Sequence, residues 1–320
     1  MAERENLYKL ISRNKWGTGL FVLLFTLILA VIGMGLGLWF GWDWWVYALF
    51  GIGIVLYNLV LYFNSSRIAL AVNGARPAGT EEFKQLHNVV EEVAIAAGLP
   101  KPGVYVIETE APNAFATGRD PEHASIAVTR GLVEMMSRDE LQGVVAHELA
   151  HIRNYDILMM TVVAIIGGII ILFRDVFLRW GLFFGGGRRR RSSAGRGGGG
   201  QVQLILMIVG LVLAILAPLL VALIRSAISR QREYLADASG AYIVRNPNGL
   251  ASALSKLAGT RQKLRSASNA TAHMFITNPF AKDRDISSSW FSSHPPLADR
   301  IDRLRVLTME GRDEAVDGRR

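Results

Sequence analysis

Residues 141–156 read LQGVVAHELAHIRNYD, and within them His147, Glu148 and His151 have the spacing His-Glu-x-x-His. The segment lacks proline and has good helix formers around the motif, so we expect it to be helical. Helical residues four apart share a face, so both imidazoles can reach one tetrahedral ion while Glu148 lies beside its water. The pattern predicts a zinc site with His147 and His151 as ligands and Glu148 as general base.

A catalytic zinc ion normally takes three protein ligands and keeps its fourth position for water. The chain has no cysteine, so the third ligand has to be a histidine or a carboxylate. Glu233 meets this need from a distant segment, with Asp237 one turn further along the same expected helix. We interpret Glu233 as the ligand and Asp237 as the carboxylate that hydrogen-bonds the free nitrogen of a ligand histidine. The alternative is a pair of solvated helix charges.

Apolar residues are concentrated in blocks, which explains a hydrophobic fraction of 51% and a mean hydropathy of +0.27. The first two blocks are each about long enough to cross a ~30 Å hydrocarbon layer and are separated by a tight polar break, so they predict a helical hairpin. The four blocks are Leu20–Gly41, Trp45–Phe63, Ile157–Phe173 and Val202–Ile224.

The intervening sequence has the composition of a soluble domain, and its patterns predict a mainly α fold with a small β-sheet. A helix should open at Thr80, with Phe83, Leu86, Val90 and Val93 on one face. The capping-box spacing of Ser137 and Glu140 predicts a helix that begins near Arg138 and runs into the metal motif and the third apolar block. Three short β-like runs lie between these helices: Val104–Ile107, Ala114–Thr117 and Ser125–Val128.

These patterns divide the chain into four parts. Residues 1–64 form an N-terminal region with the two-helix transmembrane hairpin, and residues 65–156 form the first part of the domain that carries the predicted zinc site. Residues 157–224 form a second hydrophobic hairpin around an Arg/Gly-rich loop, 174–201. Within this loop, the stretch Gly185–Gly200 cannot bury enough apolar surface to order itself. Residues 225–320 complete the domain of the predicted zinc site.

Four motifs occur in the order NAFA at Asn113–Ala116, HELAHIRNYD at His147–Asp156, RQREYLAD at Arg230–Asp237 and HPPLADR at His294–Arg300. With them the chain resembles, over essentially its whole length, the HtpX-type membrane metalloproteases, which share a gluzincin-like zinc domain with the membrane CAAX prenyl proteases. The resemblance implies integral membrane helices plus that domain, with one Zn²⁺ per chain.

The implied activity is zinc-dependent cleavage of damaged or misfolded membrane proteins, which is proteolytic quality control under stress. The implied ligands are His147, His151 and Glu233, and the implied catalytic residue is Glu148.

The resemblance also suggests roles for residues outside the ligand set. Asn113, Ala114, Phe115 and Ala116 resemble the edge strand that pairs with an extended substrate backbone, although an ordinary edge strand would have the same pattern. His294 could approach the zinc-bound water or a transition-state oxyanion, and Arg300 could anchor the same loop against the zinc helix. Both could equally be structural.

The net charge of +8 fits a membrane surface better than nucleic acid, because basic residues beside membrane spans fix topology. Basic residues flank both ends of the first hairpin, and the turn between its helices has none. We therefore expect a multi-pass protein of the inner or plasma membrane whose catalytic domain faces the cytoplasm. The Arg-rich loop 174–201 opposes this bias if the second hairpin spans, so that hairpin either crosses fully or packs on the domain or lies shallow in the bilayer.

Two other functions compete with this interpretation. A prenyl-protein peptidase of the CAAX type shares the same motifs, but those enzymes have more membrane helices than the four apolar blocks found here. A catalytically silent membrane scaffold would have no chemical need for the combination of His147, Glu148, His151, Glu233 and Asp237.

Overall fold

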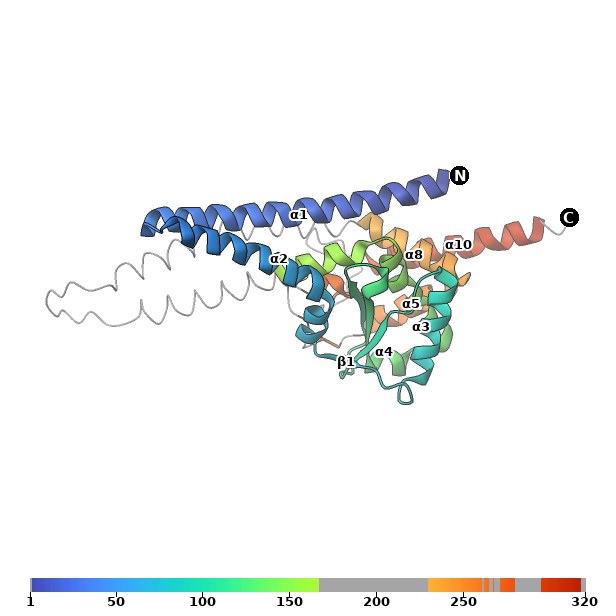
Figure 1. The fold of residues 1–320 in the computed structure, drawn as a ribbon. Coiled ribbons are helices and arrows are strands. Elements are labelled where there is room, and N and C mark those ends of the chain that lie inside the picture. Colours follow the sequence, from blue (N-terminus) through green and yellow to red (C-terminus); the bar gives the residue numbers. More distant parts are fainter. Residues whose placement is uncertain are drawn as a thin grey trace, which may run out of the picture.

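Two long helices form an antiparallel hairpin that extends from one side of the remaining structure (Figure 1). The computed structural model describes residues 2–166, 230–260, 262–264, 267, 271–279 and 295–317. In this part of the chain, α1 (Ala2–Phe40) and α2 (Trp44–Val72) are the two helices long and apolar enough to cross a membrane. Both are candidate membrane spans by length and composition.

The two helices approach each other closely at glycines. A Cβ atom on Gly33 would lie 2.0 Å from the ring of Phe50, and one on Gly37 would lie 2.3 Å from the ring of Tyr47. The aromatic rings of α2 therefore occupy the space that side chains on α1 would fill.

A four-stranded mixed sheet follows the hairpin, with its strands in the order β1-β2-β4-β3. The central pair β2–β4 is parallel, and the other two pairs are antiparallel. The sequence predicted three of these strands and missed β1, whose three residues are too few to show an alternating pattern. The strands are β1 (Ala75–Pro77), β2 (Gly103–Ile107), β3 (Ala114–Gly118) and β4 (Ala124–Thr129).

Both faces of the sheet are covered. Alternate side chains of a strand point to opposite faces, and here each set packs into its own hydrophobic cluster. Ala116 and Ile126 point into the main core, whereas Phe115 and Ala127 point into a second cluster that includes Leu70 at the end of α2. Strand β3 thus lies at the end of the sheet and is still buried.

Helices surround the sheet and make the described part of the protein mostly helical, as expected. Helix α3 begins at Lys84, later than the predicted start at Thr80, because residues 80–83 form a turn. It ends at Gly98, whose φ of +67° gives the left-handed cap that glycine favours. The helices are α3 (Lys84–Ala97), α4 (Arg130–Met135), α5 (Arg138–Arg153), α8 (Arg230–Val244), α9 (Pro247–Gly259) and α10 (Leu297–Asp317), with short 3₁₀ turns η1 (Pro121–His123) and η2 (Ala272–Met274).

The chain bends sharply directly after the metal motif. Helix α5 ends at Arg153, and the next helix, Asp156–Ile166, is inclined to it by 88°. Tyr155 makes the corner with a φ of +58°, an uncommon value for a residue with a side chain. The expectation that the metal helix runs directly into the third apolar block was therefore wrong.

The described part of that block packs inside the protein. Met159, Val163 and Ile166 are buried in a cluster with Phe21 of α1 and Leu61 of α2. The rest of the third block, the loop 174–201 and the fourth block lie outside the described residues, so the alternatives for the second hairpin all remain predictions.

Candidate metal centre

Helix α5 carries the His-Glu-x-x-His motif through the core. Its first turn is closed by the predicted capping box, in which the Ser137 side chain accepts from the Glu140 amide and the Glu140 carboxylate accepts from the Ser137 amide. Helix α8 packs tightly against α5 at Gly240, where a Cβ atom would lie 2.9 Å from the backbone nitrogen of His147. This close approach brings Glu233, about two turns earlier on α8, over the motif.

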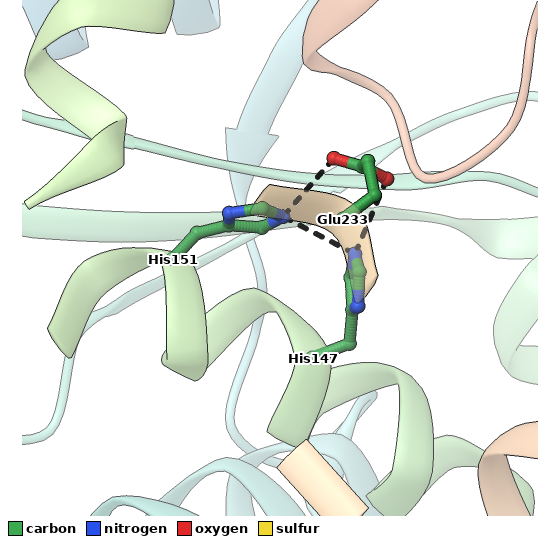
Figure 2. Close-up of side chains that lie close together, drawn as sticks. All are labelled: His147, His151 and Glu233. Carbon is green, nitrogen blue, oxygen red and sulfur yellow. Dashed lines mark hydrogen bonds and ion pairs between the residues drawn. The ribbon is translucent and has the colours of Figure 1, made fainter. Parts of the chain in front are cut away.

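Three side chains converge at this point (Figure 2). The Nε2 atoms of His147 and His151 lie 3.2 Å apart. The Glu233 carboxylate completes the group, with one oxygen 3.9 Å from His147 Nε2 and the other 3.5 Å from His151 Nε2. Donors that share a tetrahedral zinc ion lie roughly 3.4 Å apart, given ligand bonds of about 2.1 Å. The spacing of the three residues fits such an ion.

Each histidine is held at its other ring nitrogen by a buried carboxylate. Asp237 Oδ1 lies 2.9 Å from His147 Nδ1, and Asp156 Oδ2 lies 3.1 Å from His151 Nδ1. A neutral histidine whose Nδ1–H donates to a carboxylate presents the lone pair of Nε2. Both imidazoles are thus oriented as metal ligands.

Asp237 is in turn held by Arg300, a fully buried residue of α10. The guanidinium donates through Nε and Nη2 to the two Asp237 oxygens, each at 2.7 Å, and through Nη1 to the carbonyl of Ile276 at 3.1 Å. Nη1 also lies 3.4 Å from Glu233 Oε2. Arg300 therefore fixes α10 to the ligand helix α8, and it contacts both Asp237 and Glu233 of that helix.

The electrostatics of the group favour a cation between the three side chains. Burial opposes the charged form of His151, yet the hydrogen bond that it donates to Asp156 and the charge of Glu233 raise its pKa to about 9. Burial lowers the pKa of His147 despite its contact with Asp237. Burial also disfavours the ionised form of Asp237, but Arg300 and His147 hold its pKa below the usual range. Asp237 is therefore held in its ionised form, and the carboxylates around His151 favour a positive charge at this position.

Glu148 lies on the same helix and is also buried, with 2% of its surface exposed. Burial raises its pKa to about 7, and the neighbouring Glu233 adds to this, while His151, Arg300 and a hydrogen bond from the Ala116 backbone amide act in the opposite direction. A carboxyl group with a pKa near neutrality can both accept and return a proton.

The Ala116 amide belongs to the outer edge of β3, which in the described chain pairs with β4 alone. The remainder of the predicted edge strand is engaged by the protein itself. Asn113 donates from Nδ2 to the Thr277 carbonyl at 2.9 Å, the Ala114 carbonyl accepts from the Ile276 amide at 2.9 Å, and Phe115 packs edge-on against Phe275. The contact of this strand with Glu148 is made by the Ala116 amide.

The sequence interpretation omitted Asp156, and it could not place His294. Asp156 is the last residue of the HELAHIRNYD motif, but nothing in its spacing relates it to His151 unless the chain bends between them. His294 lies outside the described residues.

Comparison with known proteins gives consistent matches. Residues 80–308 match the model of peptidase family M48. Proteins named Protease HtpX homolog are similar over nearly the whole chain. Those of Thermoanaerobacter pseudethanolicus and Caldanaerobacter subterraneus subsp. tengcongensis are 54% and 55% identical over 309 residues, covering 96% of this chain and 99% of each relative. That of Pyrococcus furiosus is 44% identical over 299 residues, covering 92% of this chain and 98% of the relative.

Among solved structures, the crystal structure of S. mikatae Ste24p aligns with a TM-score of 0.46 and 21% identity, covering 93% of this chain and 67% of that one.

Proposed function

The chain belongs to peptidase family M48 and is a membrane metallopeptidase, and we propose that its catalytic metal is one zinc ion held by His147, His151 and Glu233. The proposal is supported chiefly by the convergence of these three buried donors at distances that suit a tetrahedral ion. When bound, zinc acts as a Lewis acid that lowers the pKa of its water and polarises the scissile carbonyl.

The protein's own residues carry the proton transfers. Glu148 accepts the proton of the attacking water and returns it to the leaving amine, which a buried carboxylate with a pKa of about 7 can do near neutrality. Glu233 stays ionised as a ligand. Asp156, Asp237 and Arg300 hold the ligand side chains in place. These assignments make the fold a gluzincin-like domain attached to membrane helices.

We further propose that the substrates are damaged or misfolded membrane proteins. The outer edge of β3 at Ala116 adjoins Glu148, so a substrate backbone that pairs with this edge would pass the catalytic carboxylate. Strand pairing requires an extended segment and little particular sequence. A folded membrane helix does not supply such a segment, whereas a locally unfolded one does. In this proposal the peptidase domain faces the cytoplasm.

The test is proteolysis by the purified full-length protein in proteoliposomes. We expect cleavage of a destabilised membrane protein and little cleavage of its stable parent. Glu148→Gln should lower the rate by roughly 10² to 10⁴-fold, the usual contribution of a general base, and should keep about one zinc ion per chain because Glu148 is no ligand. Glu92→Gln, at an exposed position of α3, is the matched control and should cleave normally.

Two results would contradict the proposal. Full activity of Glu148→Gln would refute the role of that carboxylate. Cleavage of only a prenylated CAAX peptide included in the panel would replace the quality-control substrate with a prenyl-protein one. A silent scaffold is already set aside by the peptidase family of the chain.

A further inference from the structure

The corner between α5 and the helix Asp156–Ile166 is in contact with the start of the first membrane helix. Asn14 of α1 donates from Nδ2 to the backbone carbonyl of Asn154 at 3.0 Å and to Asp156 Oδ1. The next residue, Lys15, places its ammonium group 4.0 Å above the ring of Tyr155. All three corner residues therefore contact two consecutive residues of α1.

Asp156 links α1 to the metal centre through its two carboxylate oxygens. One of its carboxylate oxygens accepts from Asn14, and the other lies 3.1 Å from Nδ1 of the ligand His151. Asp156 and Asn14 are 1% and 9% exposed, respectively, so water has little access to replace the bond between them. A buried carboxylate that loses a hydrogen-bond donor becomes less stable in its charged form and is free to rotate.

Helix α8 also contacts Asp156 and Asn14. Arg232, next to the ligand Glu233, has Nη1 at 3.8 Å from Asp156 Oδ1 and at 3.5 Å from the side-chain oxygen of Asn14. The Asn14 amide thus donates to the carboxylate and accepts from the arginine. Asn14 therefore hydrogen-bonds both Asp156, which contacts the ligand His151, and Arg232, which is next to the ligand Glu233.

We infer that Asn14 is a positioning residue of the metal centre: by holding Asp156, it fixes the ring of His151 in the orientation that binds the metal. Helix α1 then contributes to the geometry of the metal centre in addition to anchoring the protein in the membrane. This inference rests on the proposed ligand set.

The inference is tested by zinc affinity, measured by chelator competition on the full-length chain with Glu148→Gln added to prevent self-cleavage. Asp156→Ala should weaken zinc binding by roughly 10 to 100-fold, as loss of a group that supports a ligand typically does, and Asn14→Ala by about 10-fold. Because Asn14 acts through Asp156, adding Asn14→Ala to Asp156→Ala should cause no further loss.

Asn58→Ala is the matched control. Asn58 is a membrane-helix asparagine of α2 whose amide donates to Thr26 Oγ1 and the Ile54 carbonyl, each at 3.0 Å, away from the metal centre. Its substitution should leave zinc affinity unchanged.

If Asn14→Ala does not purify as a folded protein, two isosteric variants are used instead: Asn14→Asp alone, and Asn14→Asp combined with Asp156→Asn. Asn14→Asp sets a second carboxylate against Asp156 and should weaken zinc binding, and Asp156→Asn in the same chain should restore part of the affinity by re-forming an amide–carboxylate pair. An unchanged affinity in Asn14→Ala, an equal loss in the Asp156→Ala background, or no recovery in the isosteric pair would each overturn the inference.

Glu233→Ala separates this outcome from failure of the ligand set. If Glu233→Ala loses zinc while Asn14→Ala does not, only the role of Asn14 is wrong. If Glu233→Ala keeps zinc, the proposed ligand set itself is wrong.

Discussion

At the scale of single residues, two carboxylates decide which nitrogen of each ligand histidine faces the metal position. Asp237 and Asp156 each occupy an Nδ1 atom, which leaves the two Nε2 atoms 3.2 Å apart and directed toward Glu233 (Figure 2). The imidazoles are therefore fixed before an ion binds, and less conformational freedom is lost on binding.

Asp237 provides the first test of this arrangement. We expect Asp237→Ala to weaken zinc affinity by roughly 10 to 100-fold, because His147 loses its acceptor and Arg300 loses its bidentate partner. Chelator competition measures the effect. Asp302→Ala, at an exposed position of α10, is the control. Equal zinc affinity in Asp237→Ala and the wild type would show that the Asp237 contact does not support the ligand.

The sequence identified the ligand candidates because helical spacing alone brings His147 and His151 to one face. It could not identify Asp156, whose contact with His151 depends on a positive φ at Tyr155. Nor could it decide between the roles offered for Arg300. Charged side chains are seldom fully buried, and the complete burial of this one follows from three elements meeting around Asp237.

At the scale of elements, Glu140 connects the motif helix to α9. Its carboxylate caps α5 through the Ser137 amide at 2.7 Å and also accepts from Ser252 Oγ and Lys256 Nζ of α9, each at 2.6 Å. Burial disfavours its charged form, but these donors, Lys256 first, lower its pKa from 4.5 to about 2.

This lowered pKa predicts how stability depends on pH. A carboxyl group with a folded-state pKa below its unfolded value contributes stability that is fully present above pH 4.5 and is lost as the pH falls toward 2. Glu140→Gln should therefore destabilise the protein by on the order of 2 kcal/mol at pH 7. Thermal unfolding in detergent should show the gap between variant and wild type narrowing steadily below pH 4.5.

Glu134→Gln, in the neighbouring helix α4, is the control for this experiment. A difference in unfolding temperature between Glu140→Gln and the wild type that stays constant from pH 7 to pH 3 would contradict the assignment.

Most element positions followed from local signals, and the exceptions have physical reasons. The capping box placed the start of α5 correctly, and short β-like runs bounded by turn residues placed β2, β3 and β4. Strand β1 was missed because its three residues include a proline and owe their conformation to pairing with β2. The bend after Arg153 was missed because contacts from Asn14 and Lys15, far away in sequence, stabilise it.

At the scale of the whole molecule, the membrane hairpin begins and ends at the peptidase domain (Figure 1). Asn14 of α1 touches the corner after α5, and the last turns of α2 pack against the sheet through Leu70. If the hairpin spans, as we propose, both of its ends lie on the same side of the membrane as the metal centre. The basic residues near these ends favour the cytoplasmic side.

This arrangement predicts the topology. Reporters fused after Asp156 and after Arg320 should both read cytoplasmic, whereas one fused after Asp43, in the turn between α1 and α2, should read external. Activities of a periplasmic and a cytoplasmic reporter at each position provide the measurement. An external reading at Asp156 would reverse the orientation and, with it, the compartment from which substrates are drawn.

The central claim is that His147, His151 and Glu233 together bind one metal ion, and the zinc content of the purified full-length protein tests it most directly. We predict about one zinc ion per chain in the wild type and in Glu148→Gln, and close to none in Glu233→Ala after the same dialysis. One zinc ion per chain retained by Glu233→Ala would contradict the claim and would require a different third ligand.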